Sequence, residues 1–254
     1  MIYLTSTLFA LFLLVFTPIW AIICLSVFPF MRSETRYRFV SGWNKTVLWV
    51  LEWLCGIRYE IRGMEYMLGA LNQPIIILSK HQSAWETIAY IALFPKQLCY
   101  VFKRELLWIP FFGWVMAALK MIHINRDNRE TSALSVVSQG RARLKEGKWI
   151  MLFPEGTRTA VGSHKPYLKG GARLATATGA AVIPVAHNAG RVWPRNRFLK
   201  YPGLVIISIG PVIASEGKTG GQLNSAVESW IETEMRVIDP SAYADAAKTE
   251  AHSK

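Results

Sequence analysis

The sequence is poor in cysteine. Its 254 residues include only three cysteines, Cys24, Cys55 and Cys99, which are widely spaced among apolar neighbours. An odd number of cysteines at such spacings gives neither a disulfide framework nor a zinc pattern, and a free cysteine is commonly a buried small hydrophobe. The sequence therefore excludes a small disulfide-stapled domain, and we expect a reducing compartment.

Charge is also scarce, and acidic charge most of all. Charged residues make up 18% of the chain, against about 25% in ordinary soluble domains. The 29 lysines and arginines outnumber the 17 acidic residues, which gives a net charge of +12, while 52% of the residues are hydrophobic. Disordered chains carry little apolar material, so this composition disfavours a disordered chain. Nucleic-acid binders seldom carry ten tryptophans and an uncharged opening stretch, so we expect an anionic lipid bilayer as the partner and no nucleic acid.

Charge is absent altogether from the first 31 residues, which contain no aspartate, glutamate, lysine or arginine. A helix needs roughly 20 apolar residues to cross the hydrocarbon core of a bilayer, so this stretch is long enough. It lacks the basic start and the short apolar run of a cleaved signal peptide, and we predict a retained transmembrane anchor. Arg32, Arg36 and Arg38 follow at once. By the positive-inside rule, they place the rest of the chain on the cytoplasmic side.

A second apolar segment, residues 44–56, is interrupted by Glu52 and closed by Gly56. This segment is too short to cross a bilayer. We expect either an interfacial helix or the second arm of a helical hairpin. Residues 1–56 are thus predicted to anchor the protein, and the pattern is compatible both with a single span and with a hairpin confined to one leaflet.

From residue 57 onward, short β-rich runs alternate with segments of helix length. The predicted strands are residues 57–61, 74–78, 98–102, 121–124, 149–153, 182–185 and 204–209. The predicted helices are residues 83–93, 128–146, 170–178 and 220–238. This alternation is typical of an α/β fold, here a mixed sheet flanked by helices over residues 57–238. Residues 239–254 have no hydrophobic period, and we predict a disordered tail.

The first candidate site follows the predicted strand 74–78. In open α/β sheets, binding sites lie outside the strand ends. His81 and Glu86 are five positions apart, so they meet only if His81 lies in the turn before the helix and Glu86 in its first turns. A carboxylate that holds an imidazole in one tautomer makes it a general base. The alternative is structural: Ser83 and Glu86 would form a capping box, with His81 merely in the turn.

Two further clusters follow predicted strands. Lys103 and Arg104 precede a long apolar run, which suits a phosphate beside an acyl chain and equally suits a solvated charge pair before a membrane-dipping helix. Residues 153–158 contain a glycine that lets backbone N–H groups point at an anion, and Arg158 can fork onto phosphate oxygens. A plain turn with a surface arginine is the alternative there. His187 ends a buried-strand pattern, and we predict a structural role for it.

Motifs of several enzyme classes are missing. The sequence has no G-x-S-x-G, which disfavours a nucleophile-elbow hydrolase. It has no H-E-x-x-H, and His123 and His164 have no metal-ligand neighbour four residues on, so we expect no metal. Residues 217–219 mimic the end of a phosphate-binding P-loop, but Val212 stands where that motif requires glycine.

Taken together, the clusters resemble the motifs of the glycerolipid acyltransferases, most closely the bacterial 1-acyl-glycerol-3-phosphate (lysophosphatidate) acyltransferases, over about residues 70–190. The first family motif, a histidine with an acid five residues on, matches His81 and Glu86, although the family more often has aspartate there. The second matches Lys103, Leu106, Pro110 and Gly113. The third matches Phe153, Pro154, Glu155, Gly156, Thr157 and Arg158. The fourth, apolar residues around a proline, is similar to the segment around Pro184.

The resemblance implies acyl transfer from a thioester to the free hydroxyl of 1-acyl-glycerol-3-phosphate, which gives phosphatidic acid in phospholipid biosynthesis. It implies His81 as the base and Glu86 as its carboxylate partner. The implied substrate-binding residues are Lys103, Arg104, Glu155, Gly156, Thr157 and Arg158, of which the basic ones would hold the phosphate. No cofactor is implied beyond the acyl-CoA or acyl-carrier protein that serves as co-substrate.

The implied location is the bacterial inner membrane, with the catalytic domain on the cytoplasmic side. Two alternative functions stay open. One is an acyltransferase for another lysolipid, such as a lyso-ornithine lipid or another lysophospholipid. The other is a non-catalytic, membrane-anchored lipid-binding module.

Overall fold

A computed structural model describes residues 1–110, 112–124 and 129–244. In this part of the chain, seven strands form one sheet in the order β1-β7-β6-β2-β5-β3-β4. The strands are β1 (Ile57–Arg62), β2 (Ile75–Ser79), β3 (Leu98–Lys103), β4 (Ile122–Ile124), β5 (Trp149–Leu152), β6 (Ala181–His187) and β7 (Gly203–Ile209). Every predicted strand is present, with bounds that shift by at most two residues, and the mixed α/β fold is confirmed.

The strands that carry the candidate motifs are parallel to one another. Strand β2 pairs in parallel with both β5 and β6, and β3 pairs in parallel with β5. Strand β7 is antiparallel to β6, and β1 is parallel to β7, so these two strands run against the other five. All five residues of β2 are buried, as expected for a central parallel strand that is covered on both faces. The carboxyl ends of β2, β3, β5 and β6 therefore meet at one edge of the sheet.

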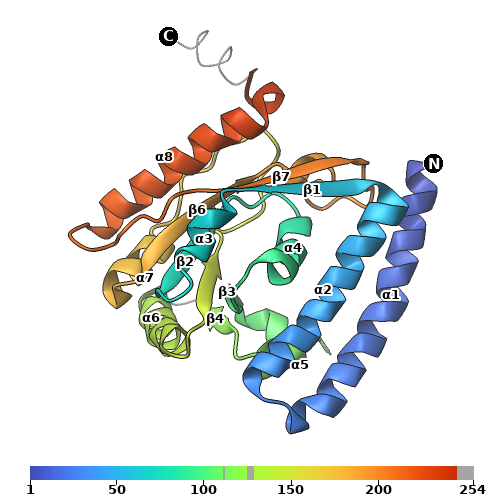
Figure 1. Cartoon of the computed structure of the whole chain (residues 1–254), viewed down its shortest axis with the longest axis horizontal. Coiled ribbons are helices and arrows are strands. Elements are labelled where there is room, and N and C mark those ends of the chain that lie inside the picture. The colour runs from blue at the N-terminus through green and yellow to red at the C-terminus, as the bar shows by residue number, and fades with distance from the viewer. Residues whose placement is uncertain (111, 125–128, 245–254) are drawn as a thin grey trace.

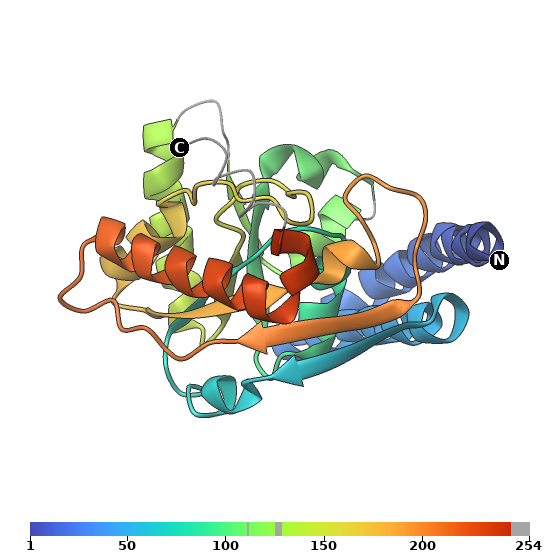
Figure 2. The same cartoon turned by 90° about the horizontal axis from the view of Figure 1, so that it is seen from above.

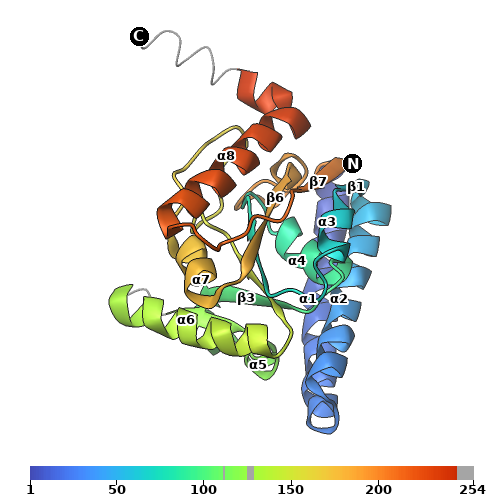
Figure 3. The ribbon, with the colours of Figure 1, turned by 60° about the vertical axis from the view of Figure 1, so that its left-hand side comes forward.

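Helices cover the sheet on both sides. After the anchor segment they are α3 (Met64–Leu68), α4 (Trp85–Leu93), α5 (Phe112–Ala118), α6 (Arg129–Lys145), α7 (Gly170–Thr178) and α8 (Gly220–Ile238). Helices α6, α7 and α8 lie on one side, and the N-terminal helices lie at the other (Figure 2, Figure 3). The four predicted helices are present, and α8 begins with a capping box between Thr219 and Gln222. Residue 128, which begins one predicted helix, lies outside the described residues.

The predicted anchor is a helical hairpin. Helix α1 (Ile2–Val27) and the short 3₁₀ helix η1 (Phe28–Phe30) are followed by α2 (Ser33–Cys55), and the two long helices run side by side (Figure 1). Helix α2 begins eleven residues before the predicted segment 44–56 and forms the second arm of the hairpin. The Arg36 Nε donates to the carbonyl oxygens of Phe28 and Met31, at 2.9 and 3.0 Å, and so holds the bend.

The amino end of the hairpin is attached to the α/β domain. The ring of Phe9 meets Trp193 edge-on, with centroids 5.7 Å apart. The Ser6 hydroxyl accepts the backbone N–H of Lys200 at 2.9 Å. The buried Lys200 ammonium lies over the rings of Phe9, Trp193 and Phe198, at 4.7–5.4 Å from their centroids, an arrangement favoured by the negative faces of aromatic rings. The hairpin is thus part of the folded unit.

The prediction of a disordered tail from residue 239 was wrong for its first residues. Asp239 is buried, and its carboxylate accepts the Arg191 Nε–H, shared between its two oxygens, and an Nη2–H, at 2.8–3.1 Å. Residues 240–244 are helical, and Tyr243 is buried. This segment packs because an ion pair and an aromatic side chain offset the weak local signal. Residues 245–254 lie outside the described residues.

Candidate active site

His81 and Glu86 meet at the carboxyl end of β2. The His81 Nδ1 lies 2.8 Å from the Glu86 Oε1. His81 lies in the turn after the strand, and α4 begins at Trp85, so Glu86 is in the first helical turn, as the spacing requires. A carboxylate only accepts hydrogen bonds, so the Nδ1 carries the proton and the Nε2 is the basic nitrogen.

The Glu86 carboxylate is fully buried and ionised. Burial opposes its charge most strongly, but the His187 and His81 rings and the Ser83 N–H outweigh burial and lower the pKa of Glu86. Its Oε1 accepts the backbone N–H groups of Gln82 and Ser83, at 3.1 and 2.9 Å, as well as the His81 ring. The charge of Glu86 is thus available to stabilise an imidazolium on His81.

The capping box predicted at Ser83 forms only in half. Glu86 accepts the Ser83 N–H, but the Ser83 hydroxyl accepts from the Trp85 N–H at 3.1 Å and donates to the Trp193 carbonyl at 2.6 Å. Helix α4 begins two residues later than predicted, and the other half of the box is missing because the Ser83 hydroxyl accepts the Trp85 N–H and not that of Glu86. The catalytic and the capping interpretations of Glu86 are therefore compatible.

The third motif wraps around His81. The ring of Phe153, which directly follows β5, stacks on the His81 imidazole with centroids 3.9 Å apart. The Glu155 Oε2 accepts the backbone N–H of His81 at 2.7 Å, and the Thr159 N–H donates to the His81 carbonyl at 2.8 Å. Glu155 is fully buried and does not line the cavity described next. It holds the loop against His81, and the expectation that it contacts substrate has no support in this geometry.

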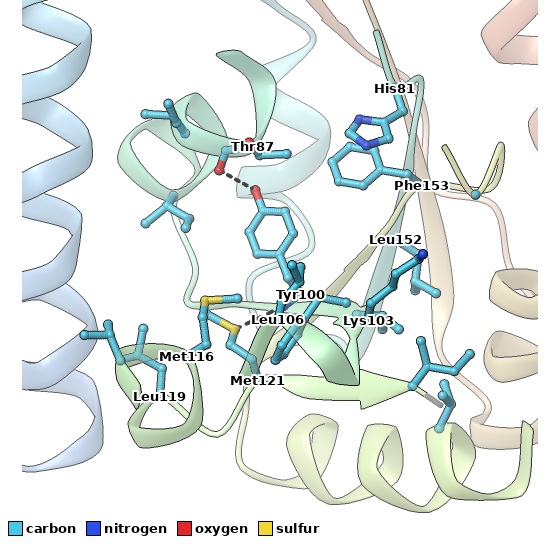
Figure 4. Close-up of a pocket in the computed structure, with 18 of the residues that line it drawn as sticks. His81, Thr87, Tyr100, Lys103, Leu106, Met116, Leu119, Met121, Leu152 and Phe153 are labelled. Atoms are coloured by element: carbon cyan, nitrogen blue, oxygen red, sulfur yellow. Dashed lines mark hydrogen bonds between the residues drawn. The ribbon is translucent and has the colours of Figure 1, made fainter. Parts of the chain in front are cut away.

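A cavity of about 940 Å³ begins at His81 and extends to the N-terminal hairpin. This volume is in the range of small-molecule binding sites, roughly 300–1,000 Å³. Most of its wall is apolar, and Figure 4 shows Leu106, Met116, Leu119 and Met121 below the stacked rings of His81 and Phe153. Both arms of the hairpin contribute, with Thr17, Trp20, Ala21 and Cys24 from α1 and Val40, Trp43 and Asn44 from α2. A long apolar chain can therefore lie with one end at His81.

Among the residues that the structure describes, three cationic side chains border this cavity: Lys103, Arg158 and Arg173. Lys103 and Arg158 were predicted, whereas Arg173 at the start of α7 was not, because it lies in a helix outside every motif. Arg104 is exposed and does not line the cavity, and neither does the exposed Thr157. Of the predicted pair Lys103 and Arg104, Lys103 is therefore the one that lines the cavity.

The comparisons with known proteins agree with this geometry. Residues 58–188, about half of the chain, match the family model described as Acyltransferase. The chain belongs to the acyltransferase family.

Relatives of this acyltransferase come from bacteria, plants and mammals. The 1-acyl-sn-glycerol-3-phosphate acyltransferase of Pseudomonas aeruginosa is 40% identical over 239 residues, which cover 92% of this chain and 91% of that protein. A coconut (Cocos nucifera) protein of the same name is 26% identical and covers 85% of this chain and 68% of its own. The crystal structure of the 1-acyl-sn-glycerophosphate acyltransferase from Thermotoga maritima has a TM-score of 0.76 and 22% identity, with coverage of 92% of this chain and 95% of that chain. That likeness establishes the fold.

The remaining motif residues of the acyltransferase support its loops. Gly113 is needed because a β-carbon there would collide with the carbonyl of Leu107. Gly156 has a φ of +69°, in the left-handed region that glycine tolerates. Pro154 lines the cavity, whereas Pro110 is exposed. Pro184 lies within β6, where its carbonyl accepts the Gly210 N–H at 2.9 Å.

His187 is structural in the acyltransferase, as its position in a buried strand predicts. Its Nε2 lies 2.8 Å from the Lys80 carbonyl, and its Nδ1 accepts the Ala189 N–H at 3.1 Å. The Nε2 must therefore carry the proton. Burial is the main influence and lowers the pKa of His187, so the ring is neutral. In the described part of the chain, no group of three or more histidine, cysteine or acidic residues could hold a metal ion.

Proposed function

We propose that this acyltransferase transfers an acyl group from a thioester to the free hydroxyl of 1-acyl-glycerol-3-phosphate, producing phosphatidic acid and a thiol. The observation that carries the proposal is the His81–Glu86 pair, whose His81 lines an apolar cavity that Lys103, Arg158 and Arg173 also line. A base beside a chain-shaped cavity and several cations suits a substrate with a hydroxyl, a phosphate and acyl chains. The names of the relatives specify the same acceptor.

In the proposed reaction, the His81 Nε2 removes the proton of the acceptor hydroxyl as its oxygen attacks the thioester carbonyl. Glu86 stabilises the imidazolium that forms. Collapse of the tetrahedral intermediate breaks the carbon–sulfur bond, and the imidazolium returns the proton to the leaving thiolate. Of the three cysteines, only Cys24 lines the cavity, and it lies on α1 with no hydrogen bond to the His81 imidazole. A direct transfer without an acyl-enzyme follows from this arrangement.

Lys103, Arg158 and Arg173 are proposed to bind the acceptor phosphate and so place its hydroxyl at His81. Among them Arg158 is the best placed, because it ends the motif that wraps His81 and its buried Nε has no hydrogen-bond partner among the described residues. The acyl chain would occupy the apolar part of the cavity. Coenzyme A or an acyl-carrier protein would carry the donor, and no resident cofactor is needed.

The hairpin is proposed to seat the enzyme in the cytoplasmic leaflet of a bacterial inner membrane, where phospholipids are made. In the described residues, one helical stretch, residues 2–30, is long and apolar enough to cross a bilayer, and only 17% of its most apolar window is buried in the protein. Yet Ser6 and Phe9 near its start contact the domain, and Cys24 near its end lines the cavity. Because α1 runs along the domain, a hairpin in one leaflet fits better than a span that leaves it.

The test is an assay of the purified full-length protein in mixed micelles with acyl-CoA and acyl-carrier-protein donors. The acceptors are 1-acyl-glycerol-3-phosphate, lyso-ornithine lipid and lysophospholipids with larger head groups. Phosphatidic acid as the main product, lost in a folded His81→Ala variant, is the expected result. Preference for another lysolipid would change the acceptor, and turnover by His81→Ala near the wild-type rate would remove the mechanism.

A further inference from the structure

The lysine directly before the proposed base is buried in the protein interior. Lys80 is 0% exposed, and its side chain does not line the cavity. Its ammonium lies 2.8 Å from the Glu155 Oε1 and 2.8 Å from the Glu232 Oε1, and it donates to the Ser163 carbonyl at 3.2 Å. An ammonium has three donors, so these partners satisfy it completely. Lysine is almost never fully buried unless it is paired, and this one has two carboxylates.

One of these carboxylates touches the backbone of the base. The Glu155 Oε1 is paired with Lys80 and accepts the Thr159 hydroxyl at 2.9 Å, while its Oε2 accepts the His81 N–H at 2.7 Å. Glu155 is fully buried, so its orientation depends on these partners. Without the Lys80 ammonium, its charge would be buried beside one hydroxyl and one amide, and it would be expected to reorient or bind a proton.

The other carboxylate belongs to a distant element. Glu232 lies on α8, 152 positions along the chain from Lys80, and its Oε1 also accepts the Tyr167 hydroxyl at 2.8 Å. Apart from its pair with Lys80, Glu232 has no hydrogen bond or ion pair with residues 81–84. The two carboxylates are thus equally close to the same ammonium, but of the two it is Glu155 that accepts a hydrogen bond from the backbone N–H of His81.

We infer that Lys80 is a positioning residue for His81. It fixes the Glu155 carboxylate, which in turn fixes the His81 backbone and thereby the imidazole that takes the hydroxyl proton. The main chain of Lys80 is held as well, because its N–H donates to the Val185 carbonyl at 3.0 Å and its own carbonyl accepts from His187 at 2.8 Å. Glu155, Glu232 and the Ser163 carbonyl thus hold the side chain of Lys80, and strand β6 holds its main chain. This inference rests on the proposed role of His81.

Glu232 offers a matched control. Glu232→Gln removes one partner of the ammonium and leaves the Lys80–Glu155 pair in place. Adding Lys80→Met to that variant leaves Glu155 as the one remaining charge of the three. The buried net charge of the Lys80, Glu155 and Glu232 set is then −1, as in the wild type. The double variant therefore removes the Lys80–Glu155 pair at the same net buried charge as the wild type, which favours a folded protein, while Glu232→Gln alone brings that charge to zero.

The experiment measures kcat and both KM values for the full-length wild type, Glu232→Gln, Lys80→Met/Glu232→Gln and His81→Ala, together with thermal unfolding in the same micelles. We expect Glu232→Gln to lower Tm while kcat stays within about threefold. We expect Lys80→Met/Glu232→Gln to lose about 100-fold in kcat, because small displacements of a catalytic group cost that much, with KM values within about threefold.

Two results would overturn the inference. The first is a folded Lys80→Met/Glu232→Gln variant with the kcat of Glu232→Gln. The second is a loss of activity that follows the unfolded fraction in both variants, which would make Lys80 structural only.

Should the double variant fail to fold, Glu155→Gln is measured instead, because it keeps an acceptor for the His81 N–H. A kcat of Glu155→Gln far below that of Glu232→Gln supports the positioning role of Lys80 and Glu155, and an equal kcat refutes it. An active His81→Ala variant would remove the proposed function itself, and this inference with it.

Discussion

The imidazole of His81 lies parallel to the ring of Phe153, with the two planes 15° apart and the centroids 3.9 Å apart. His81 follows β2 and Phe153 follows β5, and these strands are neighbours in the sheet. Glu86 holds the edge of the imidazole through its Nδ1, and Phe153 holds its face. The ring is thereby fixed in both directions before any substrate binds.

Phe153→Leu should lower kcat with little change in either KM. The substitution keeps an apolar wall but removes a ring contact worth about 0.5–1.5 kcal/mol, which corresponds to roughly a two- to tenfold loss of rate. Steady-state kinetics with 1-acyl-glycerol-3-phosphate measures it, with Phe30→Leu at the exposed hairpin bend as the control. A rise in the acceptor KM alone would mean that Phe153 contacts substrate and does not orient His81.

Arg158→Ala should reduce kcat/KM for the acceptor by about 1.5–3 kcal/mol, the range for a hydrogen bond to a charged group. Arg104→Ala is the matched control, because Arg104 is an exposed arginine from the predicted site that does not line the cavity. We expect it to retain nearly full activity. If the donor kinetics alone change in Arg158→Ala, the arginine binds the thioester carrier and not the acceptor phosphate.

Gly113→Ala should destabilise the loop that carries the second motif. A β-carbon on Gly113 would overlap the backbone of Leu107, so the chain must shift, at a cost of about 1–3 kcal/mol. Gly221→Ala is the control, because its β-carbon would lie 3.9 Å from the Thr219 Oγ1, an ordinary van der Waals contact. Thermal unfolding in micelles should show a lower Tm for Gly113→Ala alone. Equal Tm values would mean that the loop adjusts freely.

Stability should fall as the pH drops below about 6.5, the ordinary pKa of histidine. Burial lowers the pKa of His187 in the native state, so the unfolded chain binds this proton first. The free energy of unfolding then decreases with falling pH by up to about 1.4 kcal/mol per unit, until the pH reaches the lowered native pKa. Denaturant unfolding between pH 8 and pH 5 measures this slope, which His187→Gln should reduce. The same slope in both proteins would contradict a neutral buried imidazole.

Much of the fold and the site is predictable from local patterns. Strand and helix positions follow from hydrophobic periodicity, and His81, Lys103 and Arg158 stand out because polar residues follow apolar strands. The pairing of Lys80 with Glu232 was not predictable, since the residues around Lys80 give no sign of a carboxylate on α8. Arg173 was missed for a similar reason: a basic residue in the first turns of a helix reveals nothing about a cavity beside it.

The sequence by itself determined which residues end the central strands and that an uncharged segment precedes them, because both properties depend on neighbours along the chain. The tertiary structure alone decided that Glu155 faces inward to Lys80 and His81, and that both arms of the hairpin line the cavity. It also decided which cations surround that cavity. These outcomes depend on strand order, which places β2 between β5 and β6. Strand order brings together side chains that no periodicity or spacing relates.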